Sequence, residues 1–176
     1  FSNCKNLKEI KFLKTDNVFY SYVFDGCTSL EEIVLPEEGD ITNSHYLFND
    51  CTSLKRVKLP KTYNTFLETD IFRNCTNLDE VTFHEGNTKY KAGNHCITNV
   101  AGTYLYFGYK NLDIPTTVTR IVTGAFIYNN LNLSDDLEYT IPSHVKTVEK
   151  LAYRGLTLKS FTVPSTVKFE SANISY

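Results

Sequence analysis

Hydrophobic positions recur along the first half of the chain in one repeated phrase. The phrase is Phe-x-x-Cys-x-x-Leu-x-x-Ile/Val-x-Leu/Phe, and it occurs at 1–12, 24–35, 48–59 and 72–83. Its cysteines stand at 4, 27, 51 and 75, so that the intervals are 23, 24 and 24 residues. A fixed period of this length is typical of a solenoid, in which each coil buries its apolar side chains against the next coil.

Each phrase ends in a short alternating stretch, such as Glu32–Pro36 and Arg56–Pro60. Alternation with β-branched residues predicts a strand with one buried face, and proline is expected to end it because proline has no N–H for the ladder. The pairs Asp25-Gly26, Asn49-Asp50 and Arg73-Asn74 stand where each coil must bend. Gly, Asn and Asp tolerate the left-handed backbone that such a bend needs.

Three regions are expected: regular repeats over 1–83, an insertion over 84–110, and less regular repeats over 111–176. The insertion is rich in Gly and Tyr, and a β-hairpin is predicted around Val100–Thr103. After it, Ile/Val-Pro pairs recur with their prolines at 115, 142 and 164. The whole pattern predicts one solenoid of roughly seven coils.

Composition narrows the classes of function. The chain has 176 residues, 41% of them hydrophobic, and a net charge of -2, so it can bury a core but has no basic surplus for nucleic acid. No apolar run is long enough to span a membrane. The chain has no Met and begins inside a phrase, and we therefore expect a piece of a longer protein, since solenoids need caps.

The segments Ile114–Phe126 and Phe48–Pro60 resemble the two halves of the BspA-like leucine-rich repeat, Ile-Pro-x-x-Val-x-x-Ile-x-x-x-Ala-Phe-x-x-Cys-x-x-Leu-x-x-Ile-x-Ile-Pro. The resemblance covers essentially the whole chain. It implies a leucine-rich repeat solenoid, a β-rich right-handed coil stack of the α/β horseshoe type with short helical turns and one hairpin insertion. It also implies a secreted or cell-surface protein, with attachment to host or matrix proteins in some members and no shared catalytic residue.

Candidate catalytic and metal-binding residues are scattered. The repeat cysteines lack the close pairs of a zinc site, and we expect them to be buried free thiols. Cys96, in the insertion, is expected to be the most exposed and the first to react. The four histidines match no metal or catalytic spacing, and nucleotide and hydrolase motifs are missing. The chain is therefore expected to be no enzyme and to hold no cofactor or metal.

Side chains that alternate with the buried strand positions must point outward, and stacking should align them as two columns along one continuous face. Binding of a protein ligand is predicted at the middle of this face, with the tyrosine hairpin as a flanking wall. The predicted ligand-binding residues are Val34, Arg56, Lys58, Glu80, Thr82, Tyr104 and Tyr106.

Interpretations without ligand binding remain open for the strand face, for the hairpin tyrosines and for the chain as a whole. The strand face can be merely solvated, the hairpin tyrosines can pack on their own coil, and the chain can be a structural spacer that displays other domains. A carbohydrate ligand is less favoured than a protein. Reversing the charges of Arg56 and Lys58 together is expected to weaken binding while barely changing stability.

Overall fold

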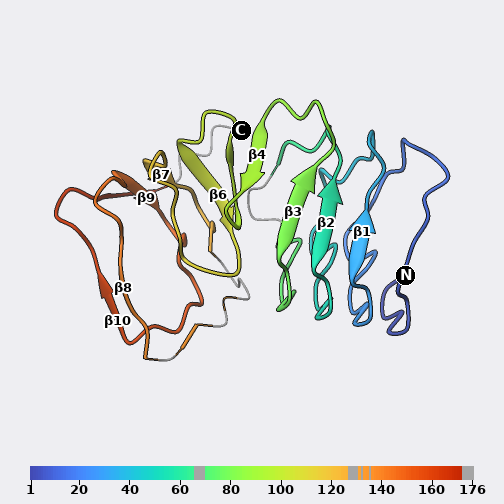
Figure 1. Cartoon of the computed structure of the whole chain (residues 1–176), viewed down its shortest axis with the longest axis horizontal. Coiled ribbons are helices and arrows are strands. Elements are labelled where there is room, and N and C mark those ends of the chain that lie inside the picture. The colour runs from blue at the N-terminus through green and yellow to red at the C-terminus, as the bar shows by residue number, and fades with distance from the viewer. Residues whose placement is uncertain (66–69, 127–130, 132, 135, 172–176) are drawn as a thin grey trace.

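The computed structural model describes residues 1–65, 70–126, 131, 133–134 and 136–171 of the chain (Figure 1). Eleven strands form in these ranges, in three sheets of order β1-β2-β3, β10-β8 and β11-β9-β7-β6-β5-β4. The strands are β1 (Glu32–Val34), β2 (Arg56–Leu59), β3 (Glu80–Phe83), β4 (Tyr90–Gly93), β5 (Cys96–Asn99), β6 (Tyr104–Gly108), β7 (Arg120–Ile121), β8 (Glu138–Thr140), β9 (Thr147–Glu149), β10 (Ser160–Thr162) and β11 (Lys168–Glu170).

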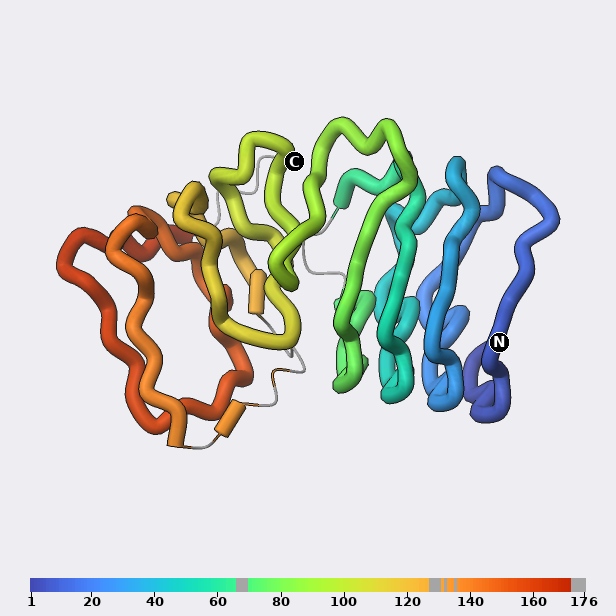
Figure 2. The backbone as a smooth tube through the Cα atoms, viewed as in Figure 1, coloured from blue at the N-terminus to red at the C-terminus, as the bar shows by residue number. Residues whose placement is uncertain are grey.

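The strands belong to a solenoid of about five turns, whose coils lie side by side along the long axis of the molecule (Figure 2). The sequence-based figure of roughly seven coils is too high. Residues 90–108 form three antiparallel strands instead of a coil, so the insertion contributes no ordinary turn.

The first three strands pair in parallel with the period of the repeat. Arg56 lies between Glu32 and Glu80, and Lys58 lies between Val34 and Thr82. Backbone bonds link successive coils, because the Lys55 N–H donates to the Glu31 carbonyl at 2.8 Å and the Asp79 N–H donates to the Lys55 carbonyl at 2.9 Å. The interval of 24 residues therefore sets the register of the sheet.

The predicted left-handed corners are confirmed. Gly26, Asp50 and Asn74 have φ values of 68°, 56° and 58°. Each precedes a cysteine whose N–H closes a turn to the carbonyl three residues earlier, as from Cys51 to Phe48 at 3.1 Å. The left-handed residue interrupts any helical run, because helices of L-residues do not continue through that conformation. The resemblance implies short helical turns, but the described residues contain no helix and form hydrogen-bonded turns at these corners instead.

Two ladders of side chains run through the first coils. The rings of Phe1, Phe24, Phe48 and Phe72 stack with centroid separations of 5.7, 5.5 and 5.7 Å. Beside them each buried thiol donates to the phenylalanine carbonyl of the preceding coil: Cys27 to Phe1 at 3.3 Å, Cys51 to Phe24 at 3.0 Å and Cys75 to Phe48 at 3.1 Å.

All five cysteines are free, but two expectations about their exposure are wrong. Cys4 is exposed, because its coil is the outermost one described and no coil covers its outer side. Cys96 is buried in a second core with Leu105 of β6 and with Ile114 and Val118, which come from the segment after the hairpin.

The predicted hairpin around Val100–Thr103 is confirmed. Its turn is held by the Asn99 side-chain oxygen, which accepts from the N–H groups of Thr103 at 2.8 Å and Tyr104 at 3.0 Å. β6 then pairs in parallel with β7 and opens the second stack of strands. Phe107 continues the aromatic ladder, with its ring 5.4 Å from that of Phe72, so the insertion joins the two cores.

Candidate ligand-binding surfaces

The outer surface of β1, β2 and β3 brings five of the seven predicted ligand-binding residues together on adjacent strands. We call it the strand face. Val34 is 48% exposed, Arg56 and Glu80 are exposed, and Lys58 and Thr82 are half-buried. The face consists of Glu32, Val34, Arg56, Lys58, Glu80 and Thr82.

In one column of the strand face, charged side chains of neighbouring strands pair with one another. The Arg56 guanidinium donates to one Glu32 carboxylate oxygen through Nη2 at 2.6 Å and through Nε at 3.1 Å. This hydrogen bond raises the pKa of Arg56 further above its ordinary value. Glu80 lies on the other side of Arg56 in the register, so that the column reads minus, plus, minus. Arg56 therefore acts first as a link between coils.

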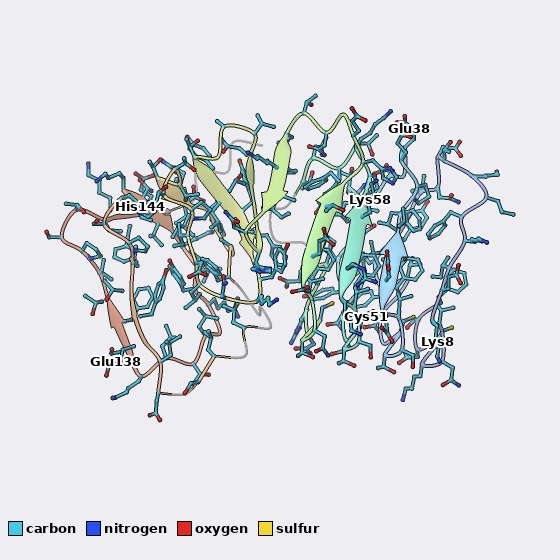
Figure 3. All side chains as sticks on the ribbon, in the orientation of Figure 1. Lys8, Glu38, Cys51, Lys58, Glu138 and His144 are labelled. Atoms are coloured by element: carbon cyan, nitrogen blue, oxygen red, sulfur yellow. The ribbon has the colours of Figure 1, made fainter. Side chains whose placement is uncertain are left out.

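The second column is Val34, Lys58 and Thr82. No hydrogen bond or ion pair of the Lys58 ammonium occurs among the described residues, in contrast to its neighbour Arg56. Lys58 is labelled on β2 in Figure 3. The column thus presents an apolar side chain, a cation and a hydroxyl in register on three strands.

The strand face ends at β3, which corrects the expectation of one continuous face along the chain. The outer N–H of β3, from Val81, donates to the Tyr109 hydroxyl at 3.0 Å. His95 contacts the Asp79 carbonyl at 3.1 Å, and Lys110 pairs with the Asp79 carboxylate. Outward positions of the later repeats do not continue this face, because Thr140, Ser160 and Thr162 are in the β8–β10 sheet and Asp113 is in no strand.

Tyr104 and Tyr106 lie on β6 of the six-stranded sheet and not on the strand face. Tyr104 is 41% exposed and lies against Arg120, whose guanidinium carbon is 5.5 Å from the ring centre. Tyr106 is half-buried with its ring edge-on to Tyr90 at 5.1 Å. Tyr90 and Tyr109 of the same insertion are buried, so packing explains much of this tyrosine content.

An ion-pair network beside Tyr104 escaped the sequence analysis. Arg120 pairs with Glu149 at 2.8 Å and with Glu170 at 2.9 Å, across three strands. Burial alone would raise the pKa of Glu149, but hydrogen bonds from Arg120 and Thr123 lower it below the ordinary 4.5. The signal in the sequence is weak, because the three residues are separated by 29 and 21 positions.

A second missed feature is the stack of Tyr22 on Tyr46, with ring centres 5.1 Å apart. Both residues have positive φ, 64° and 55°, and both precede the phenylalanine of their phrase by two positions. The recurrence at an interval of 24 residues could have revealed the stack.

The described residues hold no group of three or more His, Cys, Asp or Glu side chains that could bind a metal ion. Within the same ranges, no helix has the length and apolar character needed to cross a membrane.

The parallel coils, the aromatic and thiol ladders and the left-handed corners define a leucine-rich repeat solenoid. The family model of the BspA type leucine rich repeat region matches in six copies, over residues 1–103 and 102–174. The chain belongs to this family. No match was found among curated proteins.

Two solved structures of leucine-rich repeat proteins are similar. One, from Eubacterium ventriosum ATCC 27560, has 25% identity and a TM-score of 0.66 over 96% of this chain and 45% of that one. The other, from Bacteroides ovatus ATCC 8483, has 17% identity and a TM-score of 0.51 over 98% of this chain and 48% of that one, and it supports the fold alone. The chain therefore spans less than half the length of either protein.

Proposed function

We propose that this chain is a non-enzymatic protein-interaction module of the adhesion type, which binds its ligand on the strand face. The observation that carries the proposal is the column Val34, Lys58 and Thr82, aligned on three parallel strands with a cation that has no partner among the described residues. Equivalent positions on successive coils let weak contacts sum over a broad surface.

The composition of the strand face favours a protein ligand. Apolar, hydroxyl and charged side chains of both signs lie close together, as they do in ordinary protein interfaces. None of its six residues is aromatic, so the face lacks the flat ring on which a sugar would stack. Its charges sum to zero, from two glutamates, one arginine and one lysine, and specificity would therefore come from local pairing rather than from long-range steering.

The alternative is a structural spacer, and a specific observation favours it. Ion pairs such as Lys55–Glu31 at 2.8 Å and Lys61–Glu37 at 3.0 Å join residues 24 positions apart in neighbouring coils. A surface that satisfies its own charges in this way suits a rod that holds other domains at a distance.

Secretion or cell-surface display, with a host or matrix protein as the ligand, also belongs to the proposal. It is supported by the association of the family with bacterial surface proteins. Nucleic acid is not an expected partner, because the net charge is -2 and the chain has no basic surplus. No cofactor is expected either.

Surface plasmon resonance against immobilised, purified extracellular matrix proteins tests the proposal. The wild-type chain should bind at least one of them, and Lys58→Glu should weaken that binding at least tenfold. Lys150→Glu, at an exposed lysine in another part of the chain, is the matched control and should bind like the wild type. Binding that Lys58→Glu leaves unchanged would overturn the placement, and no binding to any protein of the panel would favour the spacer.

A further inference from the structure

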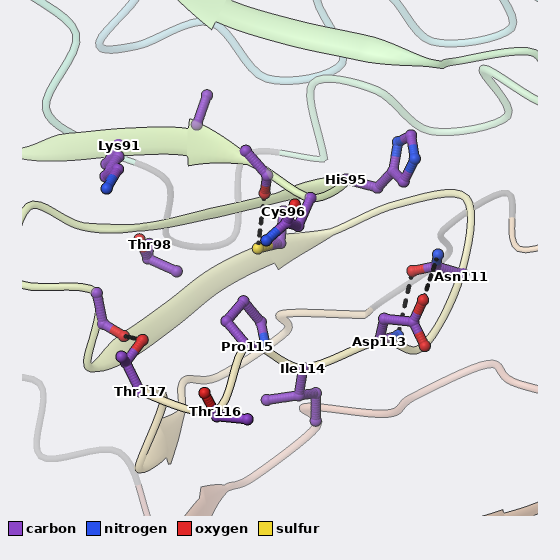
Figure 4. A pocket seen from close by; sticks show the side chains of 14 residues that line it. Lys91, His95, Cys96, Thr98, Asn111, Asp113, Ile114, Pro115, Thr116 and Thr117 are labelled. Carbon is purple, nitrogen blue, oxygen red and sulfur yellow. Dashed lines mark hydrogen bonds between the residues drawn. The ribbon is translucent and has the colours of Figure 1, made fainter.

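A cleft of about 740 Å³ opens between the β4–β5 hairpin and the segment 111–117 that follows the insertion (Figure 4). One wall is the hairpin surface that carries the cross-strand pairs Lys91–Thr98 and Gly93–Cys96. The other wall includes Asp113, Ile114 and Thr116. Binding pockets for small ligands have volumes of about 300–1,000 Å³, so the cleft is large enough to hold one.

The cleft has open space beside Gly93, one of its lining residues. A Cβ atom placed there would meet no atom within 4 Å. The neighbouring thiol of Cys96 is turned toward the Gly93 carbonyl, to which it donates at 3.1 Å, and burial raises its pKa to about 11. The hairpin wall therefore displays backbone rather than a reactive thiol.

Thr98 gives the cleft a hydroxyl group that no protein group in the described ranges occupies. The residue is only 6% exposed, and its hydroxyl takes part in no hydrogen bond among the described residues, although it lines the cleft. Thr117 differs, because its hydroxyl donates to the Gly102 carbonyl at 2.8 Å and so links the β5–β6 turn to the segment 111–117. Because the Thr98 hydroxyl can both donate and accept, a ligand that reaches this wall can form a hydrogen bond with it.

Opposite charges stand on the two walls. Lys91 is exposed on the hairpin and has no ion pair within the described ranges, and Figure 4 shows it far from Asp113 across the cleft. Asp113 is held in place by Asn111, whose amide donates to its carboxylate at 2.8 Å and whose side-chain oxygen accepts the Asp113 N–H at 3.1 Å. The cleft is thus polarised from a cation to an oriented carboxylate.

We propose that this cleft binds a short peptide segment, with an acidic group near Lys91 and a basic group near Asp113. Amide and hydroxyl groups that can donate and accept, on Asn94, Thr98 and Thr116, match the alternating N–H and C=O groups of a peptide backbone. Ile114 and Pro115 supply apolar surface between the two charged ends. Among the described lining residues the one aromatic ring is that of His95, which packs edge-on against Tyr109 with ring centres 5.8 Å apart and contacts the Asp79 carbonyl, so a stacked sugar or base fits the cleft less well.

The test titrates the full chain with the blocked hexapeptide acetyl-Glu-Ala-Ser-Ala-Ala-Lys-amide. Binding is measured by NMR shifts of the backbone amides and by calorimetry. Saturable shifts are expected at Gly93, at Gly102 and in the segment 111–117. Thr116→Trp places a bulky ring at an exposed cleft position and should abolish the shifts. Thr119→Trp, at an exposed position that does not line the cleft, is the control and should retain them.

A charge swap tests the polarity of the site. Lys91→Glu should weaken binding of the hexapeptide at least fivefold. Replacing the Glu of the peptide by Lys should restore the affinity for this variant. Lys58→Glu, on the strand face, should leave peptide binding unchanged, so failure here is separable from failure of the proposed protein ligand. Absence of shifts at millimolar peptide, or shifts that persist in Thr116→Trp, would overturn the proposal.

Discussion

The Tyr109 hydroxyl accepts the backbone N–H of Val81 at 3.0 Å, at the outer edge of β3. Both residues are buried, and the bond takes the place of the strand that would otherwise continue the sheet. Exposed strand edges invite pairing with other chains, so this hydroxyl also closes an edge that could aggregate. The insertion therefore joins the two halves of the solenoid through a side chain rather than through a ladder.

Tyr109→Phe should destabilise the protein by about 1–3 kcal/mol, because it leaves the buried Val81 N–H without an acceptor. Urea denaturation followed by circular dichroism measures the change. Tyr20→Phe, at an exposed tyrosine, should have almost no effect. Equal stabilities of the two variants would show that water or another group replaces the Tyr109 bond.

Leu54→Ala should cost about 2–5 kcal/mol, since the side chain is fully buried and shares its repeat position with Leu30 and Leu78 in the coils on either side. Leu13 is 97% exposed and gives the matched control, for which no loss is expected. A urea midpoint that does not move in Leu54→Ala would contradict the assignment of the core column.

One thiol, that of Cys4, should react rapidly with a maleimide in the native protein, because the other four cysteines are buried. Mass spectrometry after brief labelling counts the modified thiols, and labelling in urea should reach all five. Cys4→Ser should remove the fast reaction. A second fast thiol would mean that the buried column opens more readily than its packing indicates.

Stability should fall as the pH rises above 9. Burial raises the pKa of Cys51 from 9.0 to about 12 and that of Cys96 to about 11, and it also raises the pKa of Cys75. Because each folded pKa lies above the unfolded one, the contribution is complete below pH 9 and is lost as the pH rises toward the folded value. The loss approaches about 1.4 kcal/mol per pH unit for each group.

Urea midpoints measured between pH 8 and 10 test this dependence. Cys51→Ala should give a shallower slope than the wild type, even though its stability at pH 8 is lower. Cys4→Ala, at the exposed thiol, should reproduce the wild-type slope. A urea midpoint that stayed constant up to pH 10 would contradict the conclusion that these thiols are buried in their neutral form.

Features with a short and regular spacing could be predicted from the sequence. The corners at Gly26, Asp50 and Asn74 follow from local backbone preference, and the Phe and Cys ladders follow from the period. The placement of Val34, Arg56 and Lys58 on one surface follows from strand alternation. Each of these properties depends on one coil and its immediate neighbour.

Features that depend on segments from different repeats could not be predicted. The burial of Cys96 results from residues after the hairpin that cover it, and strand alternation does not reveal which face they cover. The end of the strand face depends on Tyr109 reaching Val81 across 28 residues. Likewise, the ion pair between Arg56 and Glu32 was not expected. Contrary to the expectation of barely changed stability, reversing the charge at Arg56 should lower stability by placing three carboxylates side by side.

The Phe24–Phe48 and Phe48–Phe72 junctions are nearly identical, with interplanar angles of 8° and 9°. Because each of these coils offers one surface to the coil before it and the complementary surface to the coil after it, and both surfaces repeat from coil to coil, these junctions do not fix the number of coils. Unequal recombination between the segments 24–47 and 48–71 would remove or duplicate a whole coil and keep the remaining junctions intact. The reach of the protein can therefore change in steps of about 4.8 Å, one strand spacing at a time, without a new core.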